Sequence, residues 1–170
     1  PEQLPDLEVQ KDDVILSPLP RIFGVFFNQN VAPIFVNKEV RVALDMSLDK
    51  KAIVDEILGG YGTAINSPIP SKELTSTDTA TAEEKTENAK AYLIKNGWKQ
   101  NNEGIFEKKE KSGTTILSFS ISTGDAPELK ETALLLQRQW QKLGARVEVK
   151  IFEIGDLNQD IIKTRKYDAL

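Results

Sequence analysis

The sequence predicts a mixed α/β fold, a sheet with flanking helices, from two patterns in its second half. Residues 117–121 and 145–151 each alternate apolar with polar side chains, as half-buried strands do. Between them the inward face of a helix recurs at helical spacing, on Ala133, Leu136, Gln137, Trp140 and Leu143. A strand, a helix and a second strand in this order predict a βαβ unit with parallel strands.

The chain is organised around residues 39–60, which predict two helices in tandem. Asn37 is the expected cap of the first, and Asp49 the expected cap of the second, because their side-chain oxygens can accept from free N–H groups of the opening turn. The predicted buried faces are Val40, Ala43, Leu44 and Ser47 in the first helix, and Ile53, Val54, Ile57 and Leu58 in the second. Gly59 and Gly60 should end the second helix, since glycine tolerates a left-handed backbone.

Other stretches predict elements around this centre. Thr81 and Glu84 form a capping box for a helix to about Lys95, and Asn96–Gly97 should stop it. Residues 105–109 and 114–121 predict a hairpin about Ser112–Gly113. Residues 21–28, apolar at most positions, predict a strand covered on both faces. Residues 61–81 predict an irregular loop, and Asp156 the start of a last helix.

Composition excludes several classes of function. Of 170 residues, 39% are apolar and 28% charged, so the chain is expected to be globular, and no apolar run reaches about 20 residues. The net charge of −4 comes from mixed signs without a basic patch, which argues against nucleic acid as a partner. Without cysteine or histidine, thiolate or imidazole catalysis is impossible, and we expect no cofactor and no metal.

Five ordered motifs resemble those of the bacterial extracellular solute-binding proteins of family 5, the oligopeptide- and dipeptide-binding class of ABC importers. The first is R-x-A-L-x-x-S-L-D-K-x-x-I-V, from Arg41 to Val54, with Ser47 where the family usually has alanine. The others are the F-N pair at Phe27–Asn28, the N-S-P-I-P loop at 66–70, A-K-A-Y-L-I-K-N-G-W at 89–98, and the stretch from Gln137 to Val149.

The resemblance implies a periplasmic-binding-protein-like fold of type II, of which this chain is part of the C-terminal lobe. Residues 1–20 would be an extended lead-in and residues 21–170 a single domain cut short at its end, where Tyr167–Asp168 is similar to the family's Y-D strand opening. Such lobes close on a solute, so the implied function is capture of a peptide or another small solute, without catalysis, for an ABC permease.

The resemblance also implies where the parent protein works. It is expected outside the cytoplasm, in the periplasm or on the outer face of the membrane, although no signal peptide stands in this sequence. The parent protein can carry a lipid anchor, and the isolated piece can dimerise through its cut edge strand. Nickel and sugars are bound within the family as well as peptides, so the identity of the solute stays open.

The strongest candidate for a ligand site is the segment Ser122, Thr123, Gly124 and Asp125. It lies between the end of a predicted strand and the start of a helix, where open α/β sheets bind ligands. Plain helix capping by Asp125 is an equally good interpretation, with Pro127 in the first turn. Asn66 and Ser67, in the N-S-P-I-P loop, are the second candidates.

Three further motif residues are expected to be structural. Asn28 should form a turn, Arg41 should pair with a carboxylate or bind backbone carbonyls, and Asp49 should cap its helix. A cation site at Asp45 and Asp49 is the alternative for the last.

Two other functions remain open. A carboxylate-based enzyme would need two acidic groups that converge in one pocket with separated pKa values. A sensor or adhesion module could use the same lobe without transport.

Overall fold

The computed structural model describes residues 22–67, 80–111 and 113–170. The chain divides into two compact units, one made of residues 1–24 and 50–77, the other of residues 25–49 and 78–170. The prediction that 21–170 form one domain therefore stays a prediction, and each unit is described by itself. The predicted lead-in at residues 1–20, part of the predicted loop 61–81, most of the N-S-P-I-P motif and Ser112 at the predicted hairpin turn lie outside the described residues.

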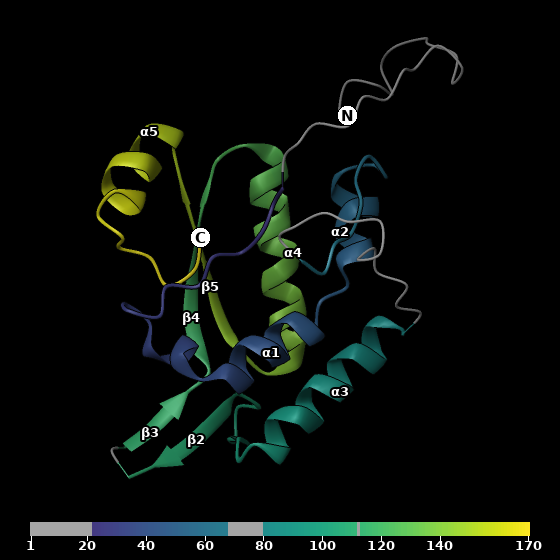
Figure 1. The fold of residues 1–170 in the computed structure, drawn as a ribbon, viewed down its shortest axis with the longest axis vertical. Helices are drawn as coiled ribbons and strands as arrows, with labels where there is room; N and C mark the ends of the chain where they lie inside the picture. Colours follow the sequence, from purple (N-terminus) through teal and green to yellow (C-terminus); the bar gives the residue numbers. More distant parts are fainter. Residues whose placement is uncertain (1–21, 68–79, 112) are drawn as a thin grey trace. The chain divides into compact units, whose positions relative to one another are not determined.

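The larger unit contains most of the regular structure (Figure 1). Its helices and strands are, in chain order, η3 (Pro33–Val36), α1 (Lys38–Met46), α3 (Ala82–Lys95), β1 (Lys99–Gln100), β2 (Phe106–Glu110), β3 (Gly113–Ile116), β4 (Ser118–Gly124), α4 (Pro127–Leu143), β5 (Arg146–Phe152), α5 (Ile154–Asp156) and η5 (Leu157–Ile162). The smaller unit contains α2 (Lys50–Ile57). The mixed α/β prediction is confirmed.

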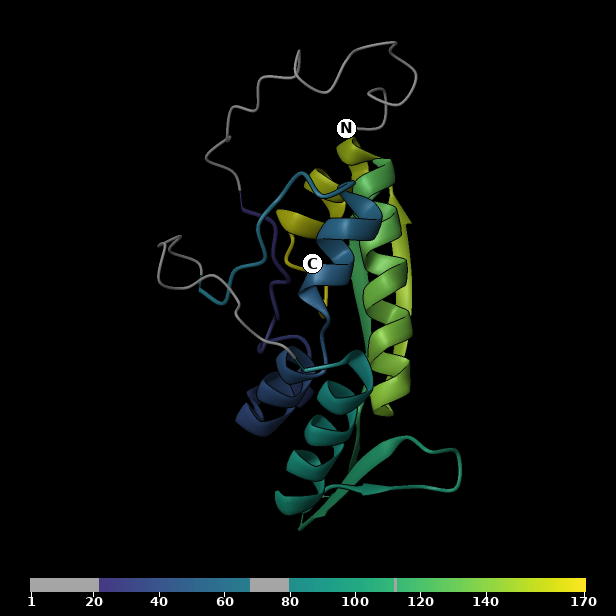
Figure 2. The same ribbon diagram turned by 90° about the vertical axis from the view of Figure 1, so that its right-hand side faces the viewer.

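The predicted βαβ unit is present and is the frame of the larger unit. β4 and β5 pair in parallel, with Ser118 opposite Arg146 and Gly124 opposite Phe152. The helix α4 contacts both strands and lies along them (Figure 2). Gly144 ends α4 in a left-handed conformation, φ 105°, and a Cβ there would lie 2.8 Å from the carbonyl oxygen of Gly104, so only glycine fits.

The end of the chain extends this sheet beyond β4. Ala169 bridges Ile121 in parallel and Phe27 in antiparallel orientation, so the order is β5, β4, the segment at Ala169 and the segment at Phe27. The backbone N–H of Ser122 donates to the Ala169 carbonyl at 2.8 Å, and Phe26 N–H donates to Leu170 O at 2.9 Å. The sheet is therefore mixed, and β4 lies inside it.

Aromatic rings join α4 to one face of this sheet. Phe119 contacts Trp140 and Phe35 edge-on, with ring centroids 5.4 and 4.9 Å apart, and Phe27 stacks on Phe35 at 4.4 Å. Trp140 is 1% exposed, and its Nε1–H donates to the Leu44 carbonyl of α1 at 3.0 Å. The core interpretation of Trp140 is confirmed.

The face predicted for α1 is also confirmed, because its four residues are all buried: Val40, Ala43, Leu44 and Ser47. The cap is different from the prediction. Asn37 occupies the N-cap position, but its side chain makes no capping bond and instead donates from Nδ2 to the Ile34 carbonyl at 3.3 Å. The preceding 3-10 turn η3 places the Ile34 carbonyl within reach of the Asn37 side chain. This hydrogen bond replaces the capping bond that the side chain was expected to make.

The capping box of α3 is present as predicted. Thr81 Oγ1 accepts from Glu84 N–H at 3.2 Å, and Glu84 Oε2 accepts from Thr81 N–H at 2.8 Å. Ala89 and Leu93 are buried, and Tyr92 is half-buried. Asn96 caps the end of the helix, and Gly97 follows it at φ 87°.

The predicted hairpin exists, but its second strand is divided. β2 and β3 pair antiparallel from Glu107–Ile116 to Glu110–Gly113, whereas β4 belongs to the other sheet. The break is at Leu117, whose N–H donates to Phe106 O and whose carbonyl accepts from Arg146 N–H. One alternating run thus crosses from one sheet to another, a change that alternation alone cannot indicate.

A polar contact ties the hairpin to α1. Lys108 Nζ donates to Glu39 Oε1 at 2.8 Å and lies 5.9 Å from the ring centroid of the buried Trp98. Burial raises the pKa of Glu39, but hydrogen bonds and the charge of Lys108 outweigh it and lower this pKa below its ordinary value of 4.5. The Trp98 indole N–H also lowers it, although it makes no hydrogen bond of ordinary geometry.

Two predicted elements differ at their boundaries. Within residues 22–28 only Phe27 forms a bridge, and Ile22, Phe23 and Phe26 are 46%, 60% and 65% exposed, so the covered strand is wrong. The last helix begins at Ile154 and continues as the π-helix η5, so Asp156 does not start it.

In the smaller unit, α2 ends as predicted, with Gly59 and Gly60 at φ 57° and 82°. Gly60 N–H donates to the Val54 carbonyl at 3.0 Å, which closes the last turn. The predicted buried stripe is wrong in degree, because Ile53, Val54, Ile57 and Leu58 are only half-buried. The apolar residues of this eight-residue helix are spaced to form one face. That spacing does not ensure that a neighbouring surface covers the face fully.

Candidate functional site

The predicted ligand segment lies at the carboxyl end of the two parallel strands. Ser122 is 2% exposed and Gly124 is buried, Thr123 is half-buried, and Asp125 is exposed just beyond the strand. Gly124 faces apolar neighbours, since a Cβ there would lie 3.5 Å from Leu129 Cδ1 and 3.7 Å from Leu157 Cδ2. Within this segment Ser122 and Gly124 are therefore covered, and only Asp125, just beyond the strand, is exposed to solvent.

The prediction that Asp125 caps α4 is wrong. The N-cap is Ala126, and no side chain makes a capping bond there. Pro127 takes the first helical position and removes one N–H that would need a partner. Because the proline displaces the start of the helix by one residue, the Asp125 carboxylate is one position too early to cap. The remaining first-turn donors of α4 are left to solvent or to a ligand.

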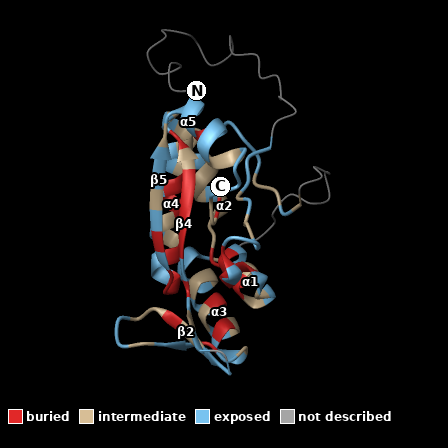
Figure 3. Ribbon diagram, turned by 90° about the vertical axis from the view of Figure 1, so that its left-hand side faces the viewer, coloured by how far each residue is buried: buried red, intermediate tan, exposed pale blue. Residues whose placement is uncertain are grey.

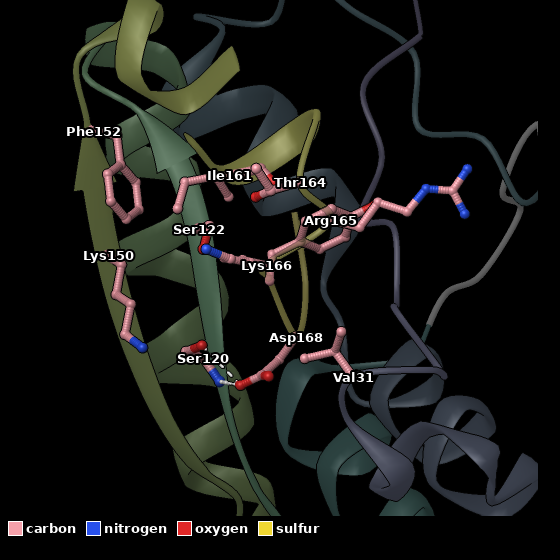
Figure 4. Close-up of a pocket in the computed structure, with 11 residues that line it drawn as sticks. Val31, Ser120, Ser122, Lys150, Phe152, Ile161, Thr164, Arg165, Lys166 and Asp168 are labelled. Atoms are coloured by element: carbon pink, nitrogen blue, oxygen red, sulfur yellow. Dashed lines mark hydrogen bonds between the residues drawn. The ribbon is translucent and has the colours of Figure 1, made fainter. Parts of the chain in front are cut away.

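A cavity of about 390 Å³ opens on the face of the β4–β5 pair opposite α4 (Figure 4). Ser122 is shared between its wall and the predicted segment. Its lining residues are Val31, Ser120, Ser122, Lys150, Phe152, Ile161, Thr164, Arg165, Lys166, Tyr167 and Asp168. Figure 4 shows Lys166 extended toward Ser122, and the Arg165 guanidinium directed away from the cavity. Sequence reasoning missed this cavity, because residues 161–168 are brought over the sheet only by the tertiary fold.

Asp168 and Ser120 close one end of the cavity. The Asp168 carboxylate accepts from both the backbone N–H and the hydroxyl of Ser120, each at 2.8 Å. Ser120 is 6% exposed, so its two donors would otherwise be buried without partners. The signal for this contact was present in the Y-D motif, but only its role as a strand opening was predicted.

Asn28 binds the segment 164–168, which lines the cavity. Its Nδ2 donates to the Arg165 carbonyl at 3.0 Å, its Oδ1 accepts from Asn30 N–H at 3.2 Å, and its backbone N–H donates to Asp168 O. Arg165 has φ 55°, the left-handed region that few non-glycine residues adopt. The F-N and Y-D motifs, far apart in sequence, are thus bonded to each other.

Arg41 and Asp49 also contact other parts of the larger unit. Arg41 donates to the Phe35 carbonyl and to the Val36 carbonyl, the latter at 3.2 Å. The Asp49 carboxylate lies 3.5 Å from Lys85 Nζ, and its backbone N–H donates to Gln139 Oε1 at 2.8 Å. These contacts agree with structural roles for both residues, which remain predictions.

Asn66 and Ser67 belong to the smaller unit. Asn66 is exposed, and its Oδ1 accepts from Lys50 Nζ at 3.2 Å. The assignment of Asn66 and Ser67 to a ligand site stays a prediction. Among the described residues, no group of three or more acidic side chains is placed to hold a metal ion. Within the same ranges, no helix combines the length and apolar character that crossing a bilayer requires.

Comparison with known proteins places this geometry in a family. The sequence model of the bacterial extracellular solute-binding proteins, family 5 Middle, matches residues 1–170. The oligopeptide-binding protein AppA of Bacillus subtilis is 32% identical in an alignment of 125 positions, gaps included, that covers 71% of this chain and 22% of AppA. The nickel-binding protein NikA of Staphylococcus aureus is 28% identical in an alignment of 183 positions, gaps included, that covers 96% of this chain and 34% of NikA.

The solved structure of AppA from Bacillus subtilis in complex with a nonapeptide has the same fold. It superposes with a TM-score of 0.66 and 28% identity, over 85% of this chain and 29% of AppA. This chain therefore spans about a third or less of the length of these relatives. Its fold is the type II periplasmic-binding-protein fold, and the chain belongs to family 5 of the bacterial extracellular solute-binding proteins.

Proposed function

We propose that this chain forms part of one lobe of a solute-binding protein that captures peptides outside the cytoplasm for an ABC permease. The observation that carries the proposal is the match of the family to all of residues 1–170, with an oligopeptide-binding protein among the relatives. Since the chain spans only part of those relatives, a second lobe would supply the remaining contacts. Closure of the two lobes on the solute would then exclude water and provide affinity without any bond being made or broken.

The segment 122–125 is the proposed contact with the peptide. The absence of a side-chain cap on α4 supports this, since the capping interpretation of Asp125 no longer accounts for the loop. First-turn N–H groups of α4 can donate to peptide carbonyls, and the exposed Asp125 carboxylate can accept from peptide N–H or amino groups. Asn66 and Ser67 are proposed as a second, weaker contact.

A lone lobe should bind weakly. A cleft shared by two lobes offers each only part of the contacts, and losing about 4 kcal/mol weakens binding about a thousandfold. Titration of the 170-residue chain with a mixed peptide pool at millimolar concentration, followed by amide NMR shifts, tests the proposal. We expect small shifts at Thr123–Asp125, reduced in Asp125→Ala and retained in Asp160→Ala, an exposed acid on η5.

Two results would contradict this proposal. Submicromolar binding by the chain alone would show a complete site rather than a shared one. Shifts confined to Asp45, Asp49 and Asp55 would move the site to acidic residues of the stretch 39–60. Permease and ATPase genes beside the gene for the full protein would support import, as opposed to a sensor or adhesion role.

A further inference from the structure

We propose that the cavity beside β4 binds the carboxylate of a small organic acid, with Ser122, Lys150 and Lys166 as its donors. This cavity lies on the face of the sheet and shares only Ser122 with the segment 122–125. The inference goes beyond peptide capture and would stand if that loop bound no peptide.

Three donors line this cavity from three separate segments, and Figure 4 shows the Lys166 nitrogen beside Ser122 and the Lys150 nitrogen lower, at the level of Ser120. Ser122 and Lys150 are direct partners in the parallel register of β4 and β5, so their side chains leave the same face of the sheet. Lys166 comes from the segment that follows η5, and Figure 4 shows its side chain reaching toward Ser122. One hydroxyl and two ammonium groups therefore line one hollow, a donor set that matches the oxygens of an anion.

The two lysines are available to a ligand. Lys166 makes no ion pair with any residue in the described part of the chain. Lys150 Nζ lies 3.6 Å from Glu148 Oε2, and the two side chains are 44% and 70% exposed. An exposed pair at that distance contributes little, so an anion in the cavity can compete for the ammonium group.

The charge of the wall favours an anion. Two lysines face one carboxylate, that of Asp168, whose Oδ2 already accepts two hydrogen bonds from Ser120. The lysine charges of this wall therefore favour an anionic group over a neutral or cationic one.

The other walls and the size describe the rest of the ligand. Phe152, Ile161 and Val31 supply apolar surface beside the donors. A volume of about 390 Å³ is within the range of small-molecule sites, about 300–1,000 Å³. The ligand class is thus a carboxylate with a short apolar substituent, either a free organic acid or the C-terminal residue of a peptide.

Butyrate is the probe for the free acid, with butanamide and butylammonium as neutral and cationic analogues of similar length. In amide NMR titrations of the 170-residue chain, we expect butyrate to shift Ser120, Ser122 and Lys150 with a dissociation constant on the order of millimolar. The two analogues should cause no such shifts. Equal responses to butanamide and butyrate would overturn the proposal, because a carboxylate site must distinguish charge.

Substitution of the donors tests their assignment. Lys166→Met should weaken butyrate binding about tenfold, because it removes a charge-assisted hydrogen bond, and Ser122→Ala should weaken it less. Lys163→Met is the matched control, since Lys163 is exposed on the same segment but does not line the cavity. Equal loss in both lysine variants, or shifts spread over lysines across the surface, would overturn the proposal.

Acetyl-glycyl-leucine and its C-terminal amide distinguish the two sources of carboxylate. A response at Ser122 and Lys150 to the acid but not the amide assigns the cavity to peptide termini, whereas a response to butyrate alone assigns it to free organic acids. If a longer form of the protein shows no butyrate response, another part of that chain fills the cavity and the proposal is wrong. Cavity shifts without peptide shifts at Thr123–Asp125 would leave this inference standing while the peptide proposal failed.

Discussion

β4 and β5 are neighbouring parallel strands of equal length, yet they differ in how they are covered (Figure 3). In β4 five of seven residues are buried, including the polar Ser120 and Ser122, whereas in β5 only Val147 is. β4 has α4 on one face, residues 161–168 on the other, and the Ala169 segment beside it. β5 shows the cleaner alternation in sequence, and within the described sheet it is the edge. Alternation therefore indicates that a strand has two different faces, but not whether its polar face is wet.

The largest effect should come from the helix face that covers β4. Trp140→Ala should reduce the free energy of unfolding by about 3–5 kcal/mol, because it removes a buried indole together with its hydrogen bond to the Leu44 carbonyl. Urea unfolding followed by circular dichroism measures the loss. Trp140→Phe, which keeps most of the ring, should lose less. An unchanged midpoint in Trp140→Ala would show that α4 does not secure β4.

A pair of isoleucines compares the two strands directly. Ile121 in β4 is 2% exposed, and Ile121→Ala should cost about 2–5 kcal/mol. Ile151 in β5 is 42% exposed, and Ile151→Ala should cost less, about 1 kcal/mol, because much of its side chain stays in water in the folded state. The same urea measurement on both variants checks the difference. Equal losses would break the contrast between an inner and an edge strand.

The buried polar face of β4 depends on Asp168. Asp168→Ala should cost about 1–3 kcal/mol, since it leaves the N–H and hydroxyl of Ser120 buried without an acceptor. Asp168→Asn keeps one acceptor oxygen and should cost less, and the exposed Asp160→Ala serves as the neutral control. If Asp168→Ala were as stable as the parent, the hydrogen bonds from Ser120 to Asp168 would add nothing to stability.

Glu39 tests whether a carboxylate also stabilises the protein away from β4, as Asp168 is expected to do on β4. Glu39 ties β2 to α1, and Lys108 holds the pKa of Glu39 below its ordinary value of 4.5 against the opposing effect of burial. A carboxyl with a lowered folded pKa stabilises the protein above its unfolded value and loses that contribution as the pH falls through the folded value. Stability of the parent should therefore fall more steeply below about pH 4.5 than that of Glu39→Gln.

This is the smallest of the expected effects. Its control is Glu110→Gln, because Glu110 is exposed and lies on β2, the strand that carries Lys108. Denaturation midpoints between pH 3 and 6 give the comparison. Parallel curves for the parent and Glu39→Gln would mean that the Glu39–Lys108 contact adds nothing to stability, and that polar anchoring matters only on the covered face of β4.

The sequence by itself determined the local elements. The capping box at Thr81 and Glu84, the glycine ends at Gly60 and Gly144, and the stripe through Trp140 were all predictable, because each depends on neighbours within one or two turns. The position of the ligand segment at a strand end was predictable for the same reason, since the βαβ order places it there.

The tertiary structure alone decided what covers each face. No local rule divides the run from Gly113 to Gly124 at Leu117, buries Ser120 and Ser122, or brings Asn28 to Arg165 and Asp168 to Ser120. These contacts join residues 48 to 137 positions apart, and their partners are chosen by the packing of the whole unit. The cavity follows from the same packing, because its donors lie on β4, β5 and the segment after η5, which only the folded chain brings together.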